Sequence, residues 1–271
     1  MSSPRFGRLL SANQIWLQPL SKRQSPYTLQ DLAKATCHRQ VNYIITVAVS
    51  QERISIPIIQ KTISIKMFLH YEAINAPHST VPSDTTQPFT IPTPPKTDIW
   101  RRTTRGDMEF NAPGVGARIP VSAFKSLSAT VSGPWKTQFD QGGILIAFPP
   151  SPGADLHDSQ WIKAGIEFFN GEPKLGVVGT DRFSDWSLCP MFEEGGKASF
   201  VAEREGDTIW VYVVVNGKKE PLREVKWADL EGRAEGAEVW VGVYGAKPTP
   251  EEGDAKAGID VSFESFKIET C

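Results

Sequence analysis

Hydrophobic and polar residues alternate with a period of two along most of the chain from Trp100 to the C-terminus. This pattern predicts β-strands, because successive side chains of a strand point to opposite faces. Helical periodicity is nearly absent there, and glycines soon interrupt the best short helix candidate, 227–236. We expect strands at 124–133, 141–149, 161–169, 172–180, 197–206, 207–215, 218–225, 238–246 and 259–270.

Two Asn-Gly pairs separate neighbouring strands of this set. One joins 161–169 to 172–180, and the other joins 207–215 to 218–225. This dipeptide tolerates positive φ at both centres of a tight turn, so both places are predicted β-hairpins. About eight or more short strands with turns between them predict an all-β sandwich of two antiparallel sheets.

Alternation also divides each strand into two faces. In 161–169 the apolar face is predicted to join the core, and the other face carries Lys163 and Glu167 beside Trp161. A mixed polar and aromatic set is what a binding face requires, whereas the alternative is an exposed face whose charges are merely solvated. On strand 141–149, Gln141 shares a face with Gly143, where a bend or a close approach of a ligand is predicted.

The chain divides into three predicted segments. Residues 1–66 carry nine Lys and Arg against two acids, whereas the chain from Met67 onward carries 20 against 29. The basic, acid-poor composition of 1–66 is typical of a disordered tail or a transit peptide, and a translation start at Met67 is the third interpretation. Residues 67–99 form a Pro- and Thr-rich extended arm expected to pack on the domain, and 100–271 form the sandwich.

Composition narrows the functional classes. A formal net charge of -2 with 40% hydrophobic residues is typical of a soluble globular protein, not of a membrane or nucleic-acid-binding protein. Cys37, Cys189 and Cys271 are scattered without metal-ligand spacing, which argues against a zinc site or a disulfide framework and indicates a reducing compartment. We expect no metal and no cofactor, and a cytoplasmic location, or a mitochondrial one if 1–66 act as a transit peptide.

A series of motifs resembles a known domain family: WRRT (100–103), FDQGGILI (139–146), WIKAGIEF (161–168), GVVGT (176–180), FSDWS (183–187) and VSFESFKI (261–268). The family has no assigned function, occurs in bacteria and fungi, and includes fungal members called regulation of enolase proteins. It is grouped with the concanavalin A-like lectins and glucanases. The match runs from about residue 73 to the C-terminus. The resemblance implies a jelly-roll β-sandwich with a concave face, and a glycolytic enzyme as a possible partner.

Enzyme chemistry of the common kinds finds little support in the motifs. The E-x-D-x-x-E run of glucanases with this fold is missing, and Lys163 is expected to lower the pKa of Glu167, which would make it a poor general acid. No Cys/His or G-x-S-x-G context for a nucleophile is present. We therefore assign no catalytic residue.

The best-supported function is a non-catalytic domain that binds a small metabolite, a glycan or a partner enzyme on its concave face. A glycan-active hydrolase or lyase, and an isomerase or cyclase acting on a small natural product, are the alternatives. Aromatic platforms and fixed polar groups carry this prediction. The predicted ligand-binding residues are Gln141, Trp161, Lys163, Glu167, Asp185, Trp186 and Tyr244.

The stretch GTDRFSDWSLCP (179–190) poses a separate question. Its place after the hairpin of Lys163 and Glu167 predicts a corner at a strand end. If the stretch is extended, alternation sends Asp185 and Trp186 to opposite sides. Only one of the two can then face a shared pocket.

Overall fold

A computed structural model of the protein describes residues 18–19, 43–44, 68–103 and 108–271. The chain divides into two compact units, 1–66 and 67–271, and each is described by itself. In the first unit, β1 (Gln18–Pro19) pairs antiparallel with β2 (Tyr43–Ile44). The predictions of a disordered tail, a transit peptide or a later translation start concern residues 1–66, of which only these two short strands are described.

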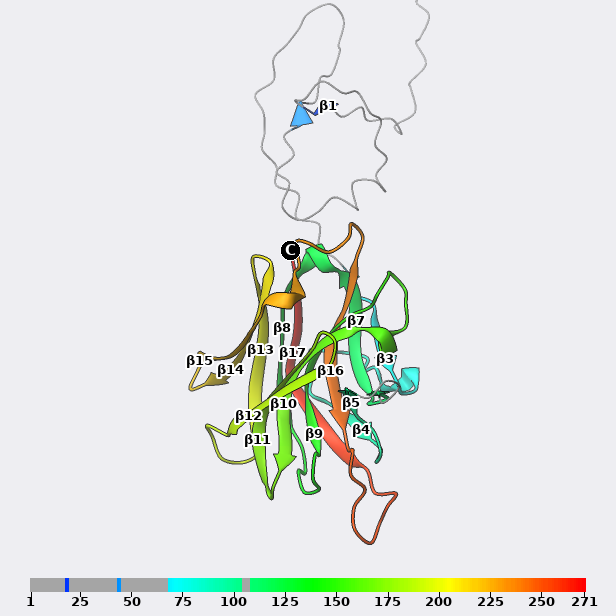
Figure 1. Ribbon diagram of the computed structural model, residues 1–271, viewed down its shortest axis with the longest axis vertical. Coiled ribbons are helices and arrows are strands. Elements are labelled where there is room, and N and C mark those ends of the chain that lie inside the picture. Colours follow the sequence, from blue (N-terminus) through cyan, green and yellow to red (C-terminus); the bar gives the residue numbers. More distant parts are fainter. Residues whose placement is uncertain (1–17, 20–42, 45–67, 104–107) are drawn as a thin grey trace, which may run out of the picture. The chain divides into compact units, whose positions relative to one another are not determined.

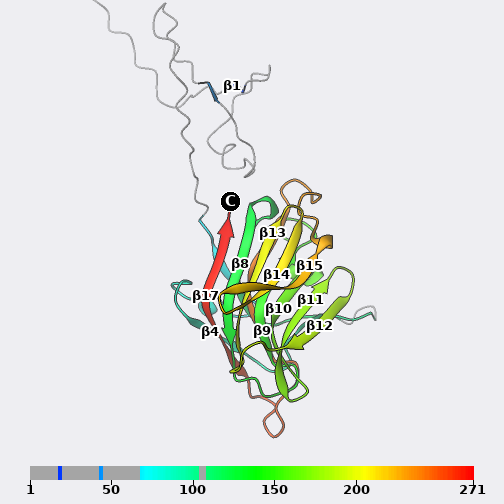
Figure 2. The same ribbon diagram turned by 90° about the vertical axis from the view of Figure 1, so that its left-hand side faces the viewer.

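Two antiparallel sheets make up the second unit (Figure 1). The larger sheet has seven strands in the order β12 (Ser184–Pro190), β11 (Glu172–Thr180), β10 (Gln160–Phe169), β9 (Gln141–Phe148), β16 (Glu238–Ala246), β7 (Gly114–Pro120) and β3 (Tyr71–Ile74). The smaller sheet has six, in the order β15 (Lys218–Val225), β14 (Thr208–Val215), β13 (Lys197–Glu205), β8 (Phe124–Ser132), β17 (Ile259–Thr270) and β4 (Phe89–Thr93). In Figure 2 the six-stranded sheet faces the viewer. The predicted two-sheet sandwich is confirmed.

Short elements complete the unit. A two-stranded hairpin, β5 (Ile99–Arg101) with β6 (Met108–Phe110), is not hydrogen-bonded into either large sheet. The 3-10 turns are η1 (His78–Thr80), η2 (Val121–Ala123), η3 (Leu156–Asp158) and η4 (Lys226–Ala228). The segment 227–236, the best of the weak helix candidates, holds only the end of η4, followed by turns.

Local turn chemistry fixes the hairpins as predicted. Asn170 and Gly171 have φ values of 52° and 89°, and Asn216 and Gly217 have 51° and 74°. Positive φ at both central residues matches the right-handed twist of the flanking strands. The pairs β10 with β11 and β14 with β15 are accordingly antiparallel neighbours.

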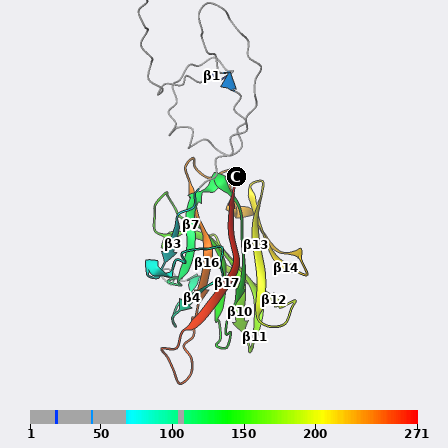
Figure 3. The same cartoon turned by 180° about the vertical axis from the view of Figure 1, so that it is seen from behind.

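The main core lies between the two sheets. Ile162, Ala164 and Ile166 of β10 are buried there together with Phe200 of β13 and Val211 of β14. The predicted core face of β10 is therefore confirmed. Seen from behind (Figure 3), the C-terminal strand β17, in red, runs along nearly the full length of the sandwich. Its Val261 and Phe263 are fully buried in the same core.

A second core covers part of the outer face of the seven-stranded sheet, the face that points away from the six-stranded sheet. Trp161, Trp240 and Leu145 pack there under Ile99 and Phe110 of the β5/β6 hairpin. As a result, every residue of β9 is buried, on both faces of the sheet. The alternation pattern does not predict a strand that is buried on both faces, because such a strand has no polar face in water to alternate with the apolar one.

The segment that precedes the hairpin supplies edge strands to both sheets. β3 pairs with β7 at one edge of the larger sheet, and β4 pairs with β17 at one edge of the smaller sheet. Ile91 of β4 is fully buried in the main core. The Pro- and Thr-rich segment is thus hydrogen-bonded into the sandwich, with Pro92 on an edge strand, where its missing N–H leaves no inner ladder broken.

Candidate functional site

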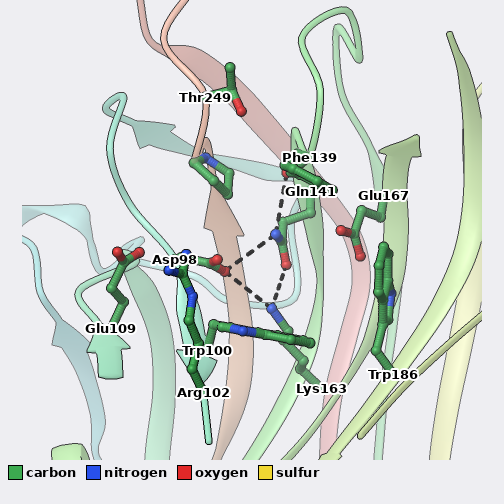
Figure 4. Close-up of a pocket in the computed structure, with 11 residues that line it drawn as sticks. Asp98, Trp100, Arg102, Glu109, Phe139, Gln141, Lys163, Glu167, Trp186 and Thr249 are labelled. Atoms are coloured by element: carbon green, nitrogen blue, oxygen red, sulfur yellow. Dashed lines mark hydrogen bonds and ion pairs between the residues drawn. The ribbon is translucent and has the colours of Figure 1, made fainter. Parts of the chain in front are cut away.

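A pocket of about 370 Å³ lies on the outer face of the seven-stranded sheet, beside the second core. The sheet forms its floor, and segments far apart in the sequence form its walls (Figure 4). Lining residues come from the β5/β6 hairpin, from strands β9, β10 and β12, and from the segment after β16. They are Asp98, Trp100, Arg102, Glu109, Phe139, Gln141, Lys163, Glu167, Trp186, Pro248 and Thr249.

A row of glycines crosses the seven-stranded sheet on the strands that carry Gln141, Lys163 and Glu167 and on the next strand, β11. Gly143, Gly165 and Gly176 are cross-strand partners on β9, β10 and β11, in one row across the sheet. A Cβ on Gly143 would lie 2.0 Å from the carbonyl oxygen of Ala164, and one on Gly165 would lie 2.1 Å from that of Gly142. Only glycine lets β9 and β10 approach in this way.

Replacing Gly165 by Ala is expected to destabilise the domain by about 2–3 kcal/mol, because the added methyl group overlaps backbone that cannot move aside. Gly179→Ala on β11 is the matched control, since the nearest atom to its Cβ would be 3.6 Å away. Its expected cost is below about 1 kcal/mol. Urea unfolding of the two variants measures both values, and equal losses would contradict the close approach of β9 and β10.

A hydrogen-bonded network of polar side chains lies at one side of the pocket. The Lys163 ammonium donates to Gln141 Oε1 at 2.8 Å and lies 3.3 Å from Asp98 Oδ1. Gln141 Oε1 also accepts from the Tyr244 hydroxyl at 3.2 Å, and Gln141 Nε2 donates to Asp98 at 3.4 Å. Lys163 is only 3% exposed, and the hydrogen bonds to these partners offset the cost of burying its ammonium group.

Glu167 lies apart from this network. Its side chain leans over Gly176, where an added Cβ would be 3.4 Å from Oε2, and Figure 4 shows the carboxylate between Gln141 and Trp186. Burial raises the pKa of Glu167 from 4.5 to about 7, against the opposing effect of the Lys163 charge. The Asp98 charge raises the pKa further.

This pKa corrects the expectation from the sequence. Spacing along the strand correctly places Lys163 near Glu167, but the loss of water around a carboxylate that is 8% exposed outweighs the attraction of the lysine. The expectation that Lys163 gives Glu167 a lowered pKa, and so makes it a poor general acid, was therefore wrong. A carboxyl group that titrates near neutral pH can both hold and release a proton there.

Three aromatic side chains, Trp100, Phe139 and Trp186, form another part of the lining. Trp186 lies at the centre of this group, with ring centroids 5.3 Å from Phe169, 6.1 Å from Trp100 and 6.3 Å from Phe139. All three contacts are edge-to-face, which is a favourable geometry for aromatic pairs. The buried indole N–H of Trp186 faces the Glu167 carboxylate and lowers its pKa, although the two groups do not form a hydrogen bond of ordinary geometry.

A fully buried ion pair fixes the loops that carry several lining residues. Lys247 Nζ lies 3.0 Å from Asp140 Oδ1, and both side chains are 0% exposed. Asp140 Oδ2 accepts the backbone N–H groups of Lys136 and Thr137, while the Lys247 N–H donates to the Thr97 hydroxyl. The pair thereby connects the segments that lead into Asp98, Gln141 and Pro248.

The structure brings four of the seven predicted residues into the pocket lining: Gln141, Lys163, Glu167 and Trp186. Tyr244 lies behind them, 2% exposed, and reaches the pocket through its hydrogen bond to Gln141. Trp161 shares their face of β10, but it is fully buried in the second core, where Arg101 lies 4.5 Å above its ring. Trp161 therefore holds the hairpin in place and does not line the pocket.

Residues 184–190 form an edge strand, not only the corner predicted for them; the corner is limited to 181–183. The alternation within the strand was correct. Trp186 faces the pocket, whereas the Asp185 side chain is 88% exposed and its Oδ2 lies 3.9 Å from Arg223 of β15. The structure thus places Asp185 outside the pocket that Trp186 lines.

Sequence reasoning missed the lining residues that do not come from the central strands. Asp98, Trp100, Arg102 and Glu109 belong to the β5/β6 hairpin, and Phe139 has a left-handed φ of 69° just before β9. The tryptophan of WRRT, already part of the family motif, was the available signal for the hairpin. No other local pattern indicates that it folds over the sheet.

Two structural findings concern metal binding and membrane-spanning helices. Among the described residues, no group of three or more His, Cys, Asp or Glu side chains is arranged to hold a metal ion. Within the same residues, no helix has both the length and the apolar character needed to cross a membrane.

Comparison with known proteins places the chain in a family. An uncharacterized protein of Emericella nidulans is 38% identical over 192 residues, covering 70% of this chain and 90% of the relative. Regulation of enolase protein 1 of Saccharomyces cerevisiae is 35% identical over 100 residues, 37% of this chain and 46% of that protein. A crystal structure of a functionally unknown Saccharomyces cerevisiae protein has the same fold, with a TM-score of 0.58 at 22% identity, covering 74% of this chain and 96% of that one.

A family model described as protein of unknown function (DUF1349) matches residues 74–271. That range holds both sheets of the sandwich except for the start of β3, and all residues that line the pocket. The resemblance drawn from the sequence motifs is confirmed, and the chain belongs to the DUF1349 family.

Proposed function

We propose that the domain binds a small, hydroxyl-rich molecule, such as a sugar or a sugar-like metabolite, in the pocket on the outer face of the seven-stranded sheet. The observation that carries the proposal is the convergence of aromatic rings, a buried carboxyl group without an ion-pair partner and an ordered polar network in one pocket. The volume of the pocket, about 370 Å³, lies in the lower part of the range for small-molecule sites, roughly 300–1,000 Å³.

The chemistry of the walls favours a ligand with both polar and apolar faces. The C–H face of a sugar ring can pack against Trp186 or Trp100, while its hydroxyls exchange hydrogen bonds with the groups opposite. Glu167 offers acceptor oxygens beside the indole N–H of Trp186. A buried carboxylate is costly unless its oxygens accept enough hydrogen bonds, and hydroxyl groups of a ligand would donate further ones.

Removal of Trp186 tests this proposal. We expect Trp186→Ala to weaken binding of the ligand about tenfold or more, because the ring lies at the centre of the aromatic group beside the pocket. Asp185→Ala changes the neighbouring residue on the other side of the same strand and should leave the affinity close to that of the native chain. Isothermal titration calorimetry with a panel of sugars, sugar acids and small hydroxycarbonyl compounds measures both. Binding by no member of the panel, or equal losses in the two variants, would contradict the proposal.

The name of the yeast relative supports a second candidate, in which the domain acts on a glycolytic enzyme. That relative is called regulation of enolase protein 1 and aligns with 37% of this chain. We propose enolase as the partner to test, with the full-length chain added to an enolase assay. A change in enolase rate that Trp186→Ala abolishes would connect this role to the pocket, and an unchanged rate would count against the partner.

The described cysteines support the proposed cytoplasmic location. Cys189 and Cys271 are free thiols, and Cys271 is exposed. Exposed free thiols are typical of proteins in reducing compartments.

A further inference from the structure

Glu167 differs from the other buried charged residues of the described chain. Four such side chains are less than a tenth exposed: Asp140, Lys163, Glu167 and Lys247. Lys247 pairs with Asp140, and Lys163 pairs with Asp98. Glu167 takes part in no ion pair among the described residues, although it is only 8% exposed and its carboxyl group lines the pocket. An unpaired buried carboxyl group is costly, so a role in the pocket is the simplest reason for it.

We propose that Glu167 moves a proton to and from the carbon atom next to the carbonyl group of a hydroxylated carbonyl compound bound in the pocket. This activity rests on the proposed binding function and adds a reaction to it. It makes the domain a catalyst of enolisation, the class of reaction that interconverts epimers or positional isomers of hydroxycarbonyl compounds.

The pocket supplies the three features that such a step needs. Glu167 is the base, and β10 holds its carboxyl group in the lining of the pocket. The ammonium group of Lys163, four residues earlier on the same face, provides positive charge for the oxygen that becomes negative during the step. The rings of Trp186, Trp100 and Phe139 limit the access of water, which strengthens both interactions.

The charged and titratable groups around Glu167 support the same role. Lys163 faces it from its own strand, Asp98 from the hairpin and Tyr244 from β16, while Arg102 and Glu109 lie at the rim. Their combined effect with burial gives Glu167 a pKa of about 7. A base with a pKa close to the working pH combines a useful ionised fraction with a strong driving force for proton transfer.

The step conserves atoms and electrons within the bound compound and Glu167. The C–H bond next to the carbonyl breaks, its proton goes to the Glu167 carboxylate, and its electron pair forms a carbon–carbon double bond. The carbonyl π electrons move to the oxygen, which becomes an enolate oxygen that Lys163 can stabilise. Return of the proton to either carbon, with transfer of a hydroxyl proton where needed, gives the starting compound, its epimer or its positional isomer. No oxidant or reductant is consumed.

Exchange of hydrogen for deuterium tests the proposal without knowledge of the physiological ligand. The full-length chain is incubated in D2O with dihydroxyacetone, D-fructose or D-glucuronate, and NMR follows loss of the C–H signal next to the carbonyl. We expect at least one compound to exchange about a hundredfold faster with the native chain than in buffer, in line with the usual gain from a positioned acid or base. The rate should rise with pH to a plateau, with its midpoint near the pKa of Glu167, about 7.

Matched variants separate this reaction from binding. Glu167→Gln should reduce the exchange to the rate in buffer, while Asp185→Asn, outside the pocket, should exchange like the native chain. Thermal unfolding checks that both variants fold, and calorimetry with the same three compounds checks binding. Binding of one or more of the three compounds with exchange of none, or a Glu167→Gln variant that exchanges at the native rate, would overturn the proton-transfer role and leave the binding proposal intact. Absence of both binding and exchange would overturn both.

Discussion

Replacing Glu167 by Gln is expected to stabilise the domain by roughly 3 kcal/mol at pH 8. The reason is the pKa of Glu167, which burial raises from 4.5 to about 7 in the folded protein. Above pH 7 the native chain must hold a buried carboxylate that is better solvated in the unfolded chain, and Gln removes that charge with little change of shape. Urea unfolding of the full-length chain measures the difference.

The pH dependence is opposite to that of a carboxylate in an ion pair, which stabilises the folded state at high pH and loses that contribution as pH falls. Because the folded-state pKa is the higher one, Glu167 favours the folded state below pH 4.5 relative to high pH, and this contribution is lost as pH rises to about 7. The gain from Glu167→Gln should therefore shrink to below about 1 kcal/mol at pH 5. Asp185→Asn, with its exposed side chain, is the control and should stay within about 0.5 kcal/mol at both pH values. A gain that does not depend on pH would contradict the assignment.

Removal of Asp140 is expected to have the largest effect in the opposite direction. Asp140→Ala leaves the Lys247 ammonium fully buried without its carboxylate, which typically costs about 3–5 kcal/mol. It also leaves the N–H groups of Lys136 and Thr137 without their acceptor. Urea unfolding of the full-length chain gives the loss of stability.

An exposed ion pair provides the comparison for this prediction. Lys197 Nζ lies 2.9 Å from Glu264 Oε2, with side chains 48% and 44% exposed. Lys197→Ala is expected to cost less than about 1 kcal/mol, because water solvates both charges. Similar losses for Asp140→Ala and Lys197→Ala would show that the buried pair does not hold the loops of the pocket as described.

Much of the sandwich could be predicted because its signals are local. Alternation and two Asn-Gly turns are properties of neighbouring residues, and they were sufficient for the strands between Phe124 and Thr270, except β12. The missed strands β3 to β7 are short, contain glycines or prolines, or lie at sheet edges, so they show little alternation. Their pairing depends on sequence-distant partners that no local pattern names.

The site was predictable to a smaller degree. Gln141, Lys163 and Glu167 could be placed on one face of the sheet, and Trp186 could be set opposite Asp185, from period-two alternation alone. Which part of that face stays open depends on where the β5/β6 hairpin packs, so the burial of Trp161 was beyond reach. The pKa of Glu167 was misjudged for a related reason, since sequence spacing indicates neighbouring charges but not access of water.

We place the proposed ligand in the pocket on the outer face of the seven-stranded sheet. An NMR titration of the ¹⁵N-labelled full-length chain tests this placement, because the indole N–H of Trp186 lies beside Glu167 in the pocket lining and reports on a ligand there. A sugar or hydroxycarbonyl compound that binds should shift the indole signals of Trp186 and Trp100, and leave that of Trp210, on the six-stranded sheet, unchanged. Shifts centred on Trp210, with Trp186 and Trp100 unaffected, would contradict this placement.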